Sequence, residues 1–222
     1  MSIDPNVART RVKLCGITRR ADAEVAVRAG ADAIGLVLWR GSPRAVEFDK
    51  ARSIVAALPP FVSVVGLFVD PDTDAVRAAL AAVRLDFLQF HGAEPASFCR
   101  SFGRPYLKAI AAADGVDLLE SASRYEDASG LLFDAPPAAG MPGGTGRTFD
   151  WDRIPARLAR PIVLSGGLSA ANVAAAIRRV RPYAVDASSG VEATDAEGRP
   201  QKGIKDAAKI AAFMAEVRHA DG

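Results

Sequence analysis

The sequence predicts an α/β protein built as a single-domain (β/α)8 barrel, the TIM barrel. Eight short apolar segments, each typical of a buried strand, alternate along the 222 residues with alanine-rich segments of helical periodicity. No linker divides the chain, so we expect residues 1–222 to form one domain, with residues 1–10 as a short N-terminal extension. Because half of the residues are hydrophobic and 24% are charged, the composition supports one well-packed core and excludes a disordered or collagen-like chain.

The expected strands lie at residues 12–15, 33–38, 62–68, 87–90, 106–110, 131–134, 162–164 and 184–186. Between them, apolar residues three or four positions apart predict amphipathic helices, among them residues 21–29, 74–83, 170–180 and 206–217. Thr73 and Ser169 stand where helix N-caps are expected.

Two other architectures compete with the eight-unit barrel. Eight units in 222 residues leave roughly 28 residues per unit, within the lower size range of the fold. The fifth helix is the weakest element, because residues 116–120 are few and residues 121–130 are polar, so seven units with an irregular connection are an alternative. An open doubly wound sheet is the other. It is disfavoured because no Gly-x-Gly-x-x-Gly opens a helix and no Gly-Lys-Ser/Thr ends a glycine-rich loop.

Charge and cysteine content narrow the function classes. The 28 basic and 26 acidic side chains are interspersed and leave a net charge of +2, which disfavours a nucleic-acid or membrane partner. The densest basic run, residues 178–181, stands where a helix is expected to end. The two isolated cysteines indicate neither a disulfide framework nor a zinc site. The N-terminus has no signal-peptide pattern, so we expect a cytoplasmic protein.

Small residues follow the last two expected strands. In such a barrel reactive groups lie at the C-terminal ends of the strands, and phosphate is often bound after strands seven and eight. Gly166 and Gly167 follow the seventh strand, and Ser188, Ser189 and Gly190 follow the eighth. Each segment alone is equally typical of a tight turn, but the pair predicts converging backbone N–H groups that cradle a phosphate. The glycine-rich residues 140–146 are open to two interpretations, a mobile lid or an ordinary loop.

A thiol and a carboxyl close the first and sixth strands. Alone, Cys15 is more typical of a small buried hydrophobe, and Asp134 of a turn residue that accepts backbone N–H groups. In a closed barrel of eight strands the two lie across the mouth from each other. They are therefore candidates for acid–base chemistry on opposite faces of one substrate.

Further polar residues stand near other strand ends. Arg44, after Ser42 and Pro43, is a candidate for binding a carboxylate with two parallel hydrogen bonds, or else a surface arginine. His91 is a candidate for orienting a ligand or titrating near neutral pH, or else a hydrogen-bonded histidine at the rim. We expect His219 in solvent and Cys99 in the core.

Taken in order, these segments resemble the phosphoribosylanthranilate isomerase family of tryptophan biosynthesis. The resemblance extends from about residue 11 to residues 202–206 and the following helix. It is carried by the segments Lys13-Leu14-Cys15-Gly16-Ile17-Thr18, Ser42-Pro43-Arg44, Gln89-Phe90-His91-Gly92, Leu132-Phe133-Asp134, Gly143-Gly144-Thr145-Gly146, Leu164-Ser165-Gly166-Gly167-Leu168 and Asp186-Ala187-Ser188-Ser189-Gly190-Val191-Glu192.

The resemblance implies an Amadori rearrangement without metal or cofactor. N-(5′-phosphoribosyl)anthranilate, an aminoaldose, becomes 1-(2-carboxyphenylamino)-1-deoxyribulose 5-phosphate. By this resemblance Asp134 is the general acid on the furanose ring oxygen, and Cys15 takes the C2′ proton. Arg44 faces the anthranilate, His91 and Asp186 bind substrate, and residues 166–167 and 188–190 bind phosphate.

These roles make demands on the surroundings of both groups. A free thiol has a pKa of about 8.5, so Cys15 needs positive potential to act as a base near neutral pH. Lys13, on the same face of the strand, is a candidate source, or else it pairs with Asp186 inside the barrel. Asp134 needs partial burial, or a bound anion nearby, to hold its proton.

Two other functions and two oligomeric states stay open at this point. A related phosphoribosyl aldose–ketose isomerase is one alternative, although such enzymes use a carboxylate where this chain has Cys15. A barrel that binds a sugar phosphate without catalysis is the other. The expected partner is a small phosphoribosyl molecule, and both a monomer and a homodimer are consistent with the sequence.

Overall fold

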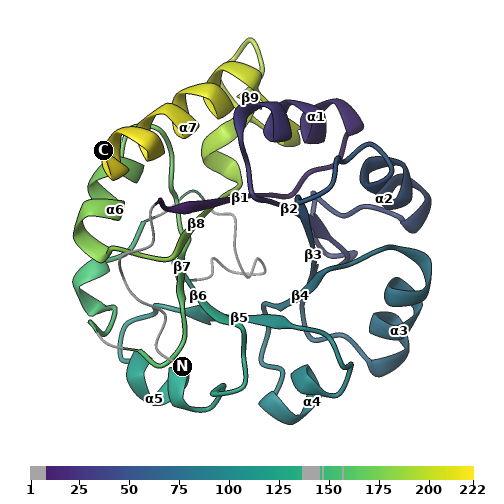
Figure 1. Ribbon diagram of the computed structural model, residues 1–222, viewed down its shortest axis with the longest axis vertical. Helices are drawn as coiled ribbons and strands as arrows, with labels where there is room; N and C mark the ends of the chain where they lie inside the picture. Colours follow the sequence, from purple (N-terminus) through teal and green to yellow (C-terminus); the bar gives the residue numbers. More distant parts are fainter. Residues whose placement is uncertain (1–8, 137–145, 147, 157) are drawn as a thin grey trace.

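Eight parallel strands close into a barrel. The computed structural model describes residues 9–136, 146, 148–156 and 158–222. The strands pair in chain order and β8 pairs with β1, which confirms the predicted (β/α)8 fold and rules out both the open sheet and the seven-unit count (Figure 1). They are β1 (Arg11–Cys15), β2 (Ala33–Val37), β3 (Ser63–Phe68), β4 (Phe87–Phe90), β5 (Tyr106–Ala111), β6 (Gly130–Asp134), β7 (Ile162–Leu164) and β8 (Ala184–Ala187).

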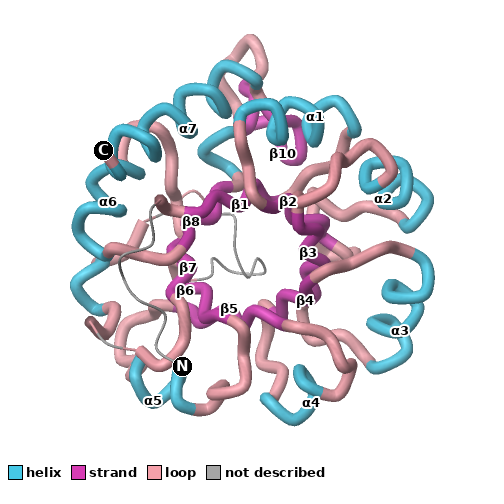
Figure 2. The backbone as a smooth tube through the Cα atoms, viewed as in Figure 1, coloured by secondary structure: helices cyan, strands magenta, loops and turns pink. Residues whose placement is uncertain are grey.

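Helices surround the barrel, as Figure 2 shows. They are α1 (Arg20–Ala29), α2 (Phe48–Val55), α3 (Thr73–Ala82), α4 (Ala96–Arg100), α5 (Leu118–Ser123), α6 (Val173–Val180) and α7 (Ala207–Asp221). The doubtful fifth helix therefore forms, although it begins and ends later than expected. The described residues between β6 and β7 form a short 3-10 helix, η1 (Trp151–Arg153), in the place where the other units have an α-helix.

Both predicted N-caps are wrong. Asp72 caps α3, because its carboxylate accepts a hydrogen bond from the Ala75 N–H at 2.7 Å, and Thr73 is the first helical residue. Helix α6 begins at Val173 instead of residue 170. The Asn172 side chain accepts a hydrogen bond from the Ser169 N–H at 2.9 Å, which holds these residues in a turn ahead of the helix.

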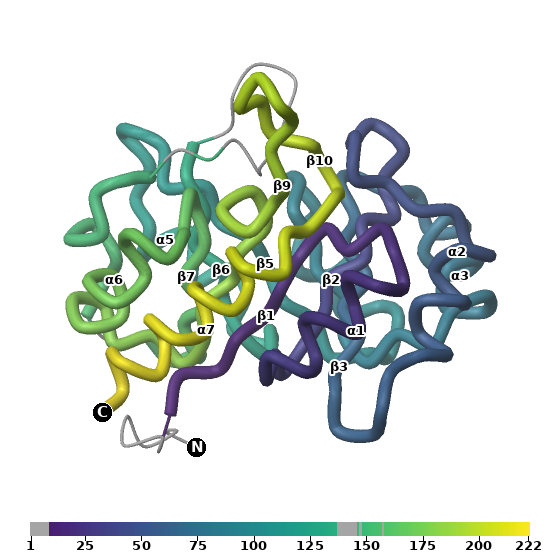
Figure 3. The backbone as a smooth tube through the Cα atoms, turned by 90° about the horizontal axis from the view of Figure 1, so that it is seen from above, coloured from purple at the N-terminus to yellow at the C-terminus, as the bar shows by residue number. Residues whose placement is uncertain are grey.

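A hairpin follows β8 that the periodicity did not predict. After the 3-10 turn η2 (Ser189–Val191), strands β9 (Glu192–Thr194) and β10 (Pro200–Lys205) pair antiparallel. Figure 3 shows them projecting at the end of the barrel opposite the C-terminus and the beginning of β1. The segment escapes detection because its residues are mostly polar and exposed.

Alternation along the strands separates the core from the barrel interior. Val12 and Leu14 belong to the main hydrophobic cluster, which includes residues from the strands and the surrounding helices, so Lys13 and Cys15 face the inside. A smaller cluster of Leu107, Ala109, Leu132, Val163 and Ala184 fills part of that interior. In the described part of the chain, no helix is long and apolar enough to cross a membrane.

Candidate active site

A cavity lies at the C-terminal ends of the strands. It encloses about 680 Å³, the space at its open mouth included. All predicted site residues except Gly190 line it, namely Cys15, Arg44, His91, Asp134, Gly166, Gly167, Asp186, Ser188 and Ser189. Closure of the barrel thus brings together residues that the chain spreads over 175 positions, as expected for this fold.

The cavity has one apolar wall. Val37 and Leu67 from β2 and β3, with Trp39 and Val69 just beyond, form a hydrophobic cluster against Cys15. A flat apolar group fits such a wall by burying its surface there.

The opposite wall is made of glycine and serine after β7 and β8. Gly166 and Gly167 have φ angles of 87° and 61°, in the left-handed region that favours glycine. A side chain at Gly166 would bring its Cβ within 2.7 Å of the Ala135 backbone nitrogen. Gly190 does not line the cavity, and a Cβ there would lie 2.0 Å from the Leu168 carbonyl oxygen. It lets the loops after β7 and β8 pack directly against each other.

Lys13 pairs with Asp186 inside the barrel. The two residues are Cα partners across β1 and β8, and Lys13 Nζ lies 3.0 Å from Asp186 Oδ2 with both side chains buried. The pairing proposed as an alternative from the sequence is therefore confirmed. Asp186 keeps one buried oxygen, Oδ1, without a hydrogen-bond partner among the described residues.

The thiol of Cys15 does not have the lowered pKa that a base requires. Burial raises its pKa, the Lys13 ammonium acts in the opposite direction, and the Asp186 carboxylate adds to the effect of burial. Lys13 is therefore a source of positive potential, as one of the two alternatives proposed, but desolvation favours the neutral thiol and Asp186 offsets part of the lysine charge.

Asp134 is held by two contacts. Its Oδ1 accepts a hydrogen bond from the Ala135 N–H at 2.8 Å, and its Oδ2 lies 3.1 Å from His91 Nε2. On the far side of the imidazole, Gln89 Nε2 lies 2.9 Å from His91 Nδ1. Gln89 is fully buried, and the sequence assigned it no role. The signal was a polar residue inside an apolar strand, two positions before a histidine and so on the same face.

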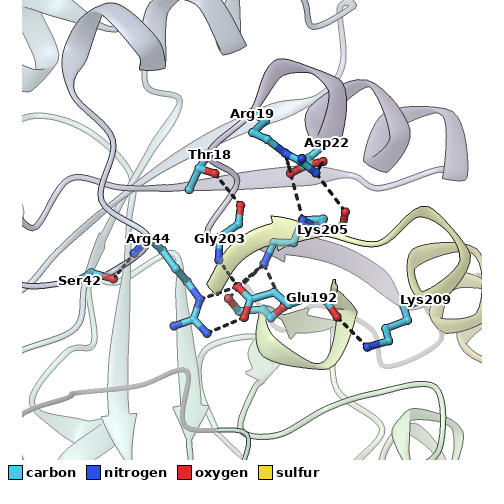
Figure 4. A network of polar contacts seen from close by, with 10 residues as sticks. Thr18, Arg19, Asp22, Ser42, Arg44, Glu192, Gly203, Lys205 and Lys209 are labelled. Atoms are coloured by element: carbon cyan, nitrogen blue, oxygen red, sulfur yellow. Dashed lines mark hydrogen bonds and ion pairs between the residues drawn. The ribbon is translucent and has the colours of Figure 1, made fainter. Parts of the chain in front are cut away.

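Arg44 is buried, not a surface arginine, and its carboxylate partner is part of the protein. Its Nε and Nη2 donate to the two oxygens of Glu192 at 2.7 and 2.8 Å (Figure 4). Glu192 also accepts the Gly203 N–H at 2.8 Å and lies 3.3 Å from Lys205 Nζ. Lys205 in turn donates to the Ser188 carbonyl at 2.9 Å. Through these contacts the β9–β10 hairpin supports both Arg44 and the serine loop.

The charges of this network act on one another. Burial by itself raises the pKa of Glu192, but Arg44 and Lys205 outweigh it and hold that pKa below the usual value. Burial lowers the pKa of Lys205, against the attraction of Glu192. The sequence motif that ends at Glu192 predicts no role for this residue, because its partner Arg44 lies 148 positions away along the chain and is brought close only by the fold.

Cys99 is buried in the core and His219 is exposed, as predicted. Of residues 140–146, for which a mobile lid and an ordinary loop were both open, Gly146 alone is in the described part of the chain, so that question lies outside the described residues. The described residues contain no cluster of three or more His, Cys, Asp or Glu side chains that could hold a metal ion.

The fold and the cavity define a class: a (β/α)8 barrel whose strand ends enclose a cavity lined by a thiol, a carboxyl group and glycine–serine loops, the place where enzymes of this fold carry their active sites. The family model of N-(5′-phosphoribosyl)anthranilate (PRA) isomerase matches residues 12–216. The N-(5′-phosphoribosyl)anthranilate isomerase of Nitrosococcus oceani is 56% identical over 209 residues, which cover 94% of this chain and 98% of that protein. The chain belongs to this family, and isomerisation of phosphoribosylanthranilate in tryptophan biosynthesis is its activity.

Solved structures agree with this assignment. Phosphoribosyl anthranilate isomerase from Thermus thermophilus superimposes with a TM-score of 0.82 at 34% identity, over 95% of this chain and 99% of that one. The same shares are covered by a phosphoribosyl anthranilate isomerase in complex with reduced 1-(o-carboxyphenylamino)-1-deoxyribulose 5-phosphate, at a TM-score of 0.78 and 36% identity. A structure of mutually generated monomers of dimeric phosphoribosylanthranilate isomerase from Thermotoga maritima superimposes over the same shares of the two chains, with a TM-score of 0.75 and 35% identity.

Proposed function

We propose that the isomerisation proceeds by general acid–base catalysis, with Asp134 as the acid and Cys15 as the base. The observation that carries the proposal is that these two side chains, from β6 and β1, line one cavity between an apolar wall and a glycine–serine wall. A pentose held between the walls is then flanked by a proton donor and a proton acceptor.

The walls set the direction of the substrate. The anthranilate ring packs on the apolar wall of Val37, Trp39, Leu67 and Val69, where burial of its surface is favourable. Arg44 stands on the same side of the cavity as a partner for negative charge. The phosphate binds at the opposite wall, where the residues after β7 and β8 are small enough for the backbone to approach it.

The acid step opens the ring. Asp134 transfers its proton to the furanose ring oxygen as the C1′–O bond breaks, and the anilino nitrogen lone pair forms the Schiff base. The carboxylate left behind is stabilised by the Ala135 N–H that Oδ1 already accepts. Because this donor is in place before the step, no reorganisation is needed when the charge develops.

The base step uses the acidity that the Schiff base confers on C2′. The Cys15 thiolate takes the C2′ proton, the electron pair moves toward the nitrogen, and the resulting enolamine tautomerises to the ketone. Burial of Cys15 raises its pKa and favours the neutral thiol. The positive charge of the Schiff base adds to that of Lys13 and shifts the balance toward thiolate when it is needed.

Two substitutions test the assignment. Asp134→Asn and Cys15→Ser should each lower kcat by at least roughly 100-fold, the low end of what a positioned acid or base contributes. Turnover is followed by the fluorescence of the anthranilate substrate. Asp152→Asn, at an exposed carboxylate, and Cys99→Ala, at the other cysteine, are the matched controls and should keep kcat within about twofold. Undiminished turnover of Asp134→Asn would remove Asp134 from the mechanism.

Two expectations about the cellular form of the protein stay predictions. A monomer or a homodimer is expected, and light scattering of the purified chain distinguishes them. Location in the cytoplasm is expected as well, and fractionation of cells that express the protein checks it.

A further inference from the structure

Three side chains form a continuous chain of contacts that ends on the proposed acid. Gln89 Nε2 lies 2.9 Å from His91 Nδ1, and His91 Nε2 lies 3.1 Å from Asp134 Oδ2. Gln89 is fully buried, and the His91 and Asp134 side chains are 12% and 8% exposed. Water therefore has little access to the imidazole, so its protein partners decide which nitrogen carries a proton.

The contacts allow one neutral tautomer in which every polar atom between the three residues is matched. With the proton on Nε2, the imidazole donates to Asp134 Oδ2, and its bare Nδ1 accepts from the Gln89 amide N–H. With the proton on Nδ1, the ring would turn an N–H toward the N–H of the Gln89 amide, and the bare Nε2 would have no donor whenever Asp134 is ionised. The amide would also have to present its oxygen, which in the structure has no hydrogen-bond partner among the described residues.

We propose that Gln89 is a positioning residue for the acid step: its amide holds His91 in the tautomer that donates from Nε2 to Asp134. The inference rests on the proposed role of Asp134. After transfer, the carboxylate already has one donor on each oxygen, His91 on Oδ2 and Ala135 on Oδ1.

The other charged groups around the imidazole have partners of their own, and the described contacts of its two nitrogens are those with Gln89 and Asp134. Across the cavity lie Cys15 from β1, Arg44 from the loop after β2, and Asp186 from β8, which is paired with Lys13. Beyond the end of β4, Lys108 and Glu94 form a buried ion pair at 2.8 Å. Lys108 also donates to the Gly92 carbonyl, so this pair holds the backbone next to His91.

The tautomer can be measured in the resting protein. The chain has two histidines, and the exposed His219 serves as an internal reference. In long-range 15N–1H correlation spectra of labelled protein between pH 7 and 9, we expect His91 to show a bare Nδ1 and a protonated Nε2. His219→Gln removes the reference signals, assigns the two sets, and should leave turnover unchanged. A protonated Nδ1 with a bare Nε2 in the wild type would overturn the proposal.

Two variants test the part that Gln89 plays. Gln89→Glu places a carboxylate against Nδ1, so both nitrogens of His91 should be protonated at neutral pH. The nitrogen pattern of His91 should change accordingly, and the pH profile of kcat should move to higher pH. Gln89→Met keeps the bulk and removes the donor. We expect mixed tautomers and a kcat at least about 10-fold lower, with KM within about twofold, since a positioned proton donor acts on the chemical step.

The outcomes separate this inference from the proposed function. A Gln89→Met protein with the wild-type nitrogen pattern and an unchanged pH profile would refute the role of Gln89. Full turnover of Asp134→Asn would instead refute the acid role, whatever the nitrogen pattern of the resting protein.

Discussion

Both carboxylate oxygens of Glu192 accept hydrogen bonds from Arg44, at 2.7 and 2.8 Å, with both side chains almost completely buried. This parallel geometry fixes the plane of the guanidinium as well as its position. The contact joins the loop after β2 to the segment after β8. Arg44, the residue expected to meet the substrate carboxylate, is therefore oriented by a residue two strands away in the barrel.

Removing the charge of Glu192 should therefore weaken both binding and stability. Glu192→Gln leaves Arg44 and Lys205 buried without their shared anion, which should lower the free energy of unfolding by about 3 kcal/mol. KM should rise about 10-fold because the guanidinium loses its fixed orientation. Urea unfolding and steady-state kinetics measure the two effects. Glu197→Gln, which breaks an exposed pair with Arg199, should change the unfolding free energy by less than about 1 kcal/mol.

The stabilisation by Glu192 should depend on pH in a defined direction. Its pKa in the folded protein lies below the usual 4.5, because Arg44 and Lys205 outweigh the effect of burial. Its contribution is thus fully present above about pH 4.5 and is lost as the pH falls through the folded value. The difference in unfolding free energy between wild type and Glu192→Gln should shrink from pH 7 to pH 3. A difference that grows in acid would contradict the assignment.

Gly190 should tolerate no side chain. Because an added Cβ would lie 2.0 Å from the Leu168 carbonyl oxygen, Gly190→Ala forces the loops after β7 and β8 apart. We expect kcat/KM to fall by at least about 10-fold, mainly through a higher KM as the phosphate site is distorted. Gly198→Ala, in the hairpin turn where no atom lies within 4 Å of the new Cβ, should cost about 1 kcal/mol of stability and leave KM unchanged.

Lys13 and Asp186 should show strong coupling in stability. Lys13→Met leaves a buried carboxylate without its partner and should cost about 3 to 5 kcal/mol. The double variant Lys13→Met with Asp186→Asn should cost less than the sum of the single changes by at least about 1 kcal/mol. Urea unfolding of the four proteins gives the coupling energy. The exposed pair Glu120 and Arg124 provides the comparison, and its coupling should be much smaller, because solvent screens the two charges.

The Cys15 thiol should ionise only in alkaline solution when no substrate is bound. Burial raises its pKa above the usual 9.0, and Lys13 reduces this effect without reversing it. In a Cys99→Ala protein, which isolates the signal of Cys15, thiolate absorbance and the alkylation rate should reach half their maximum above about pH 9. Cys99 itself should contribute little to either measurement in the wild type, because burial raises its pKa to about 12. A midpoint near pH 7 would show that the resting site already holds a thiolate.

The strands and the cavity-lining residues followed from the sequence because their signals are local. Short apolar runs between helical segments marked all eight strands, with boundaries that differ from the observed ones by one residue at most. Polar residues at or just after the ends of those runs, such as Cys15, Asp134 and His91, became candidates because reactive groups of a (β/α)8 barrel lie at the C-terminal ends of its strands. Closure of a parallel barrel then places every strand end at the same mouth, so their convergence needed no further information.

The partners of these residues did not follow from the sequence. Arg44 and Glu192 are 148 positions apart, and Lys13 and Asp186 are 173 positions apart, so their contacts depend on how the barrel closes. Gln89 drew no hypothesis, because the side chain matters only through the imidazole that lies between it and Asp134. The N-caps also did not follow: Asp72 rather than Thr73 accepts the Ala75 N–H, and the Asn172 side chain accepts the Ser169 N–H in a turn ahead of α6.

By itself the sequence determined the eight-unit barrel and the positions of its reactive groups, because hydrophobic periodicity and strand-end chemistry are written in neighbouring residues. Only the tertiary structure decided the charge state and orientation of those groups. Burial raises the pKa of Cys15, and Glu192 orients Arg44. The negative charge of Asp186 offsets part of the effect of the Lys13 charge on the pKa of Cys15. The physical reason is that desolvation and Coulomb interactions depend on distances through space, which sequence neighbours do not specify.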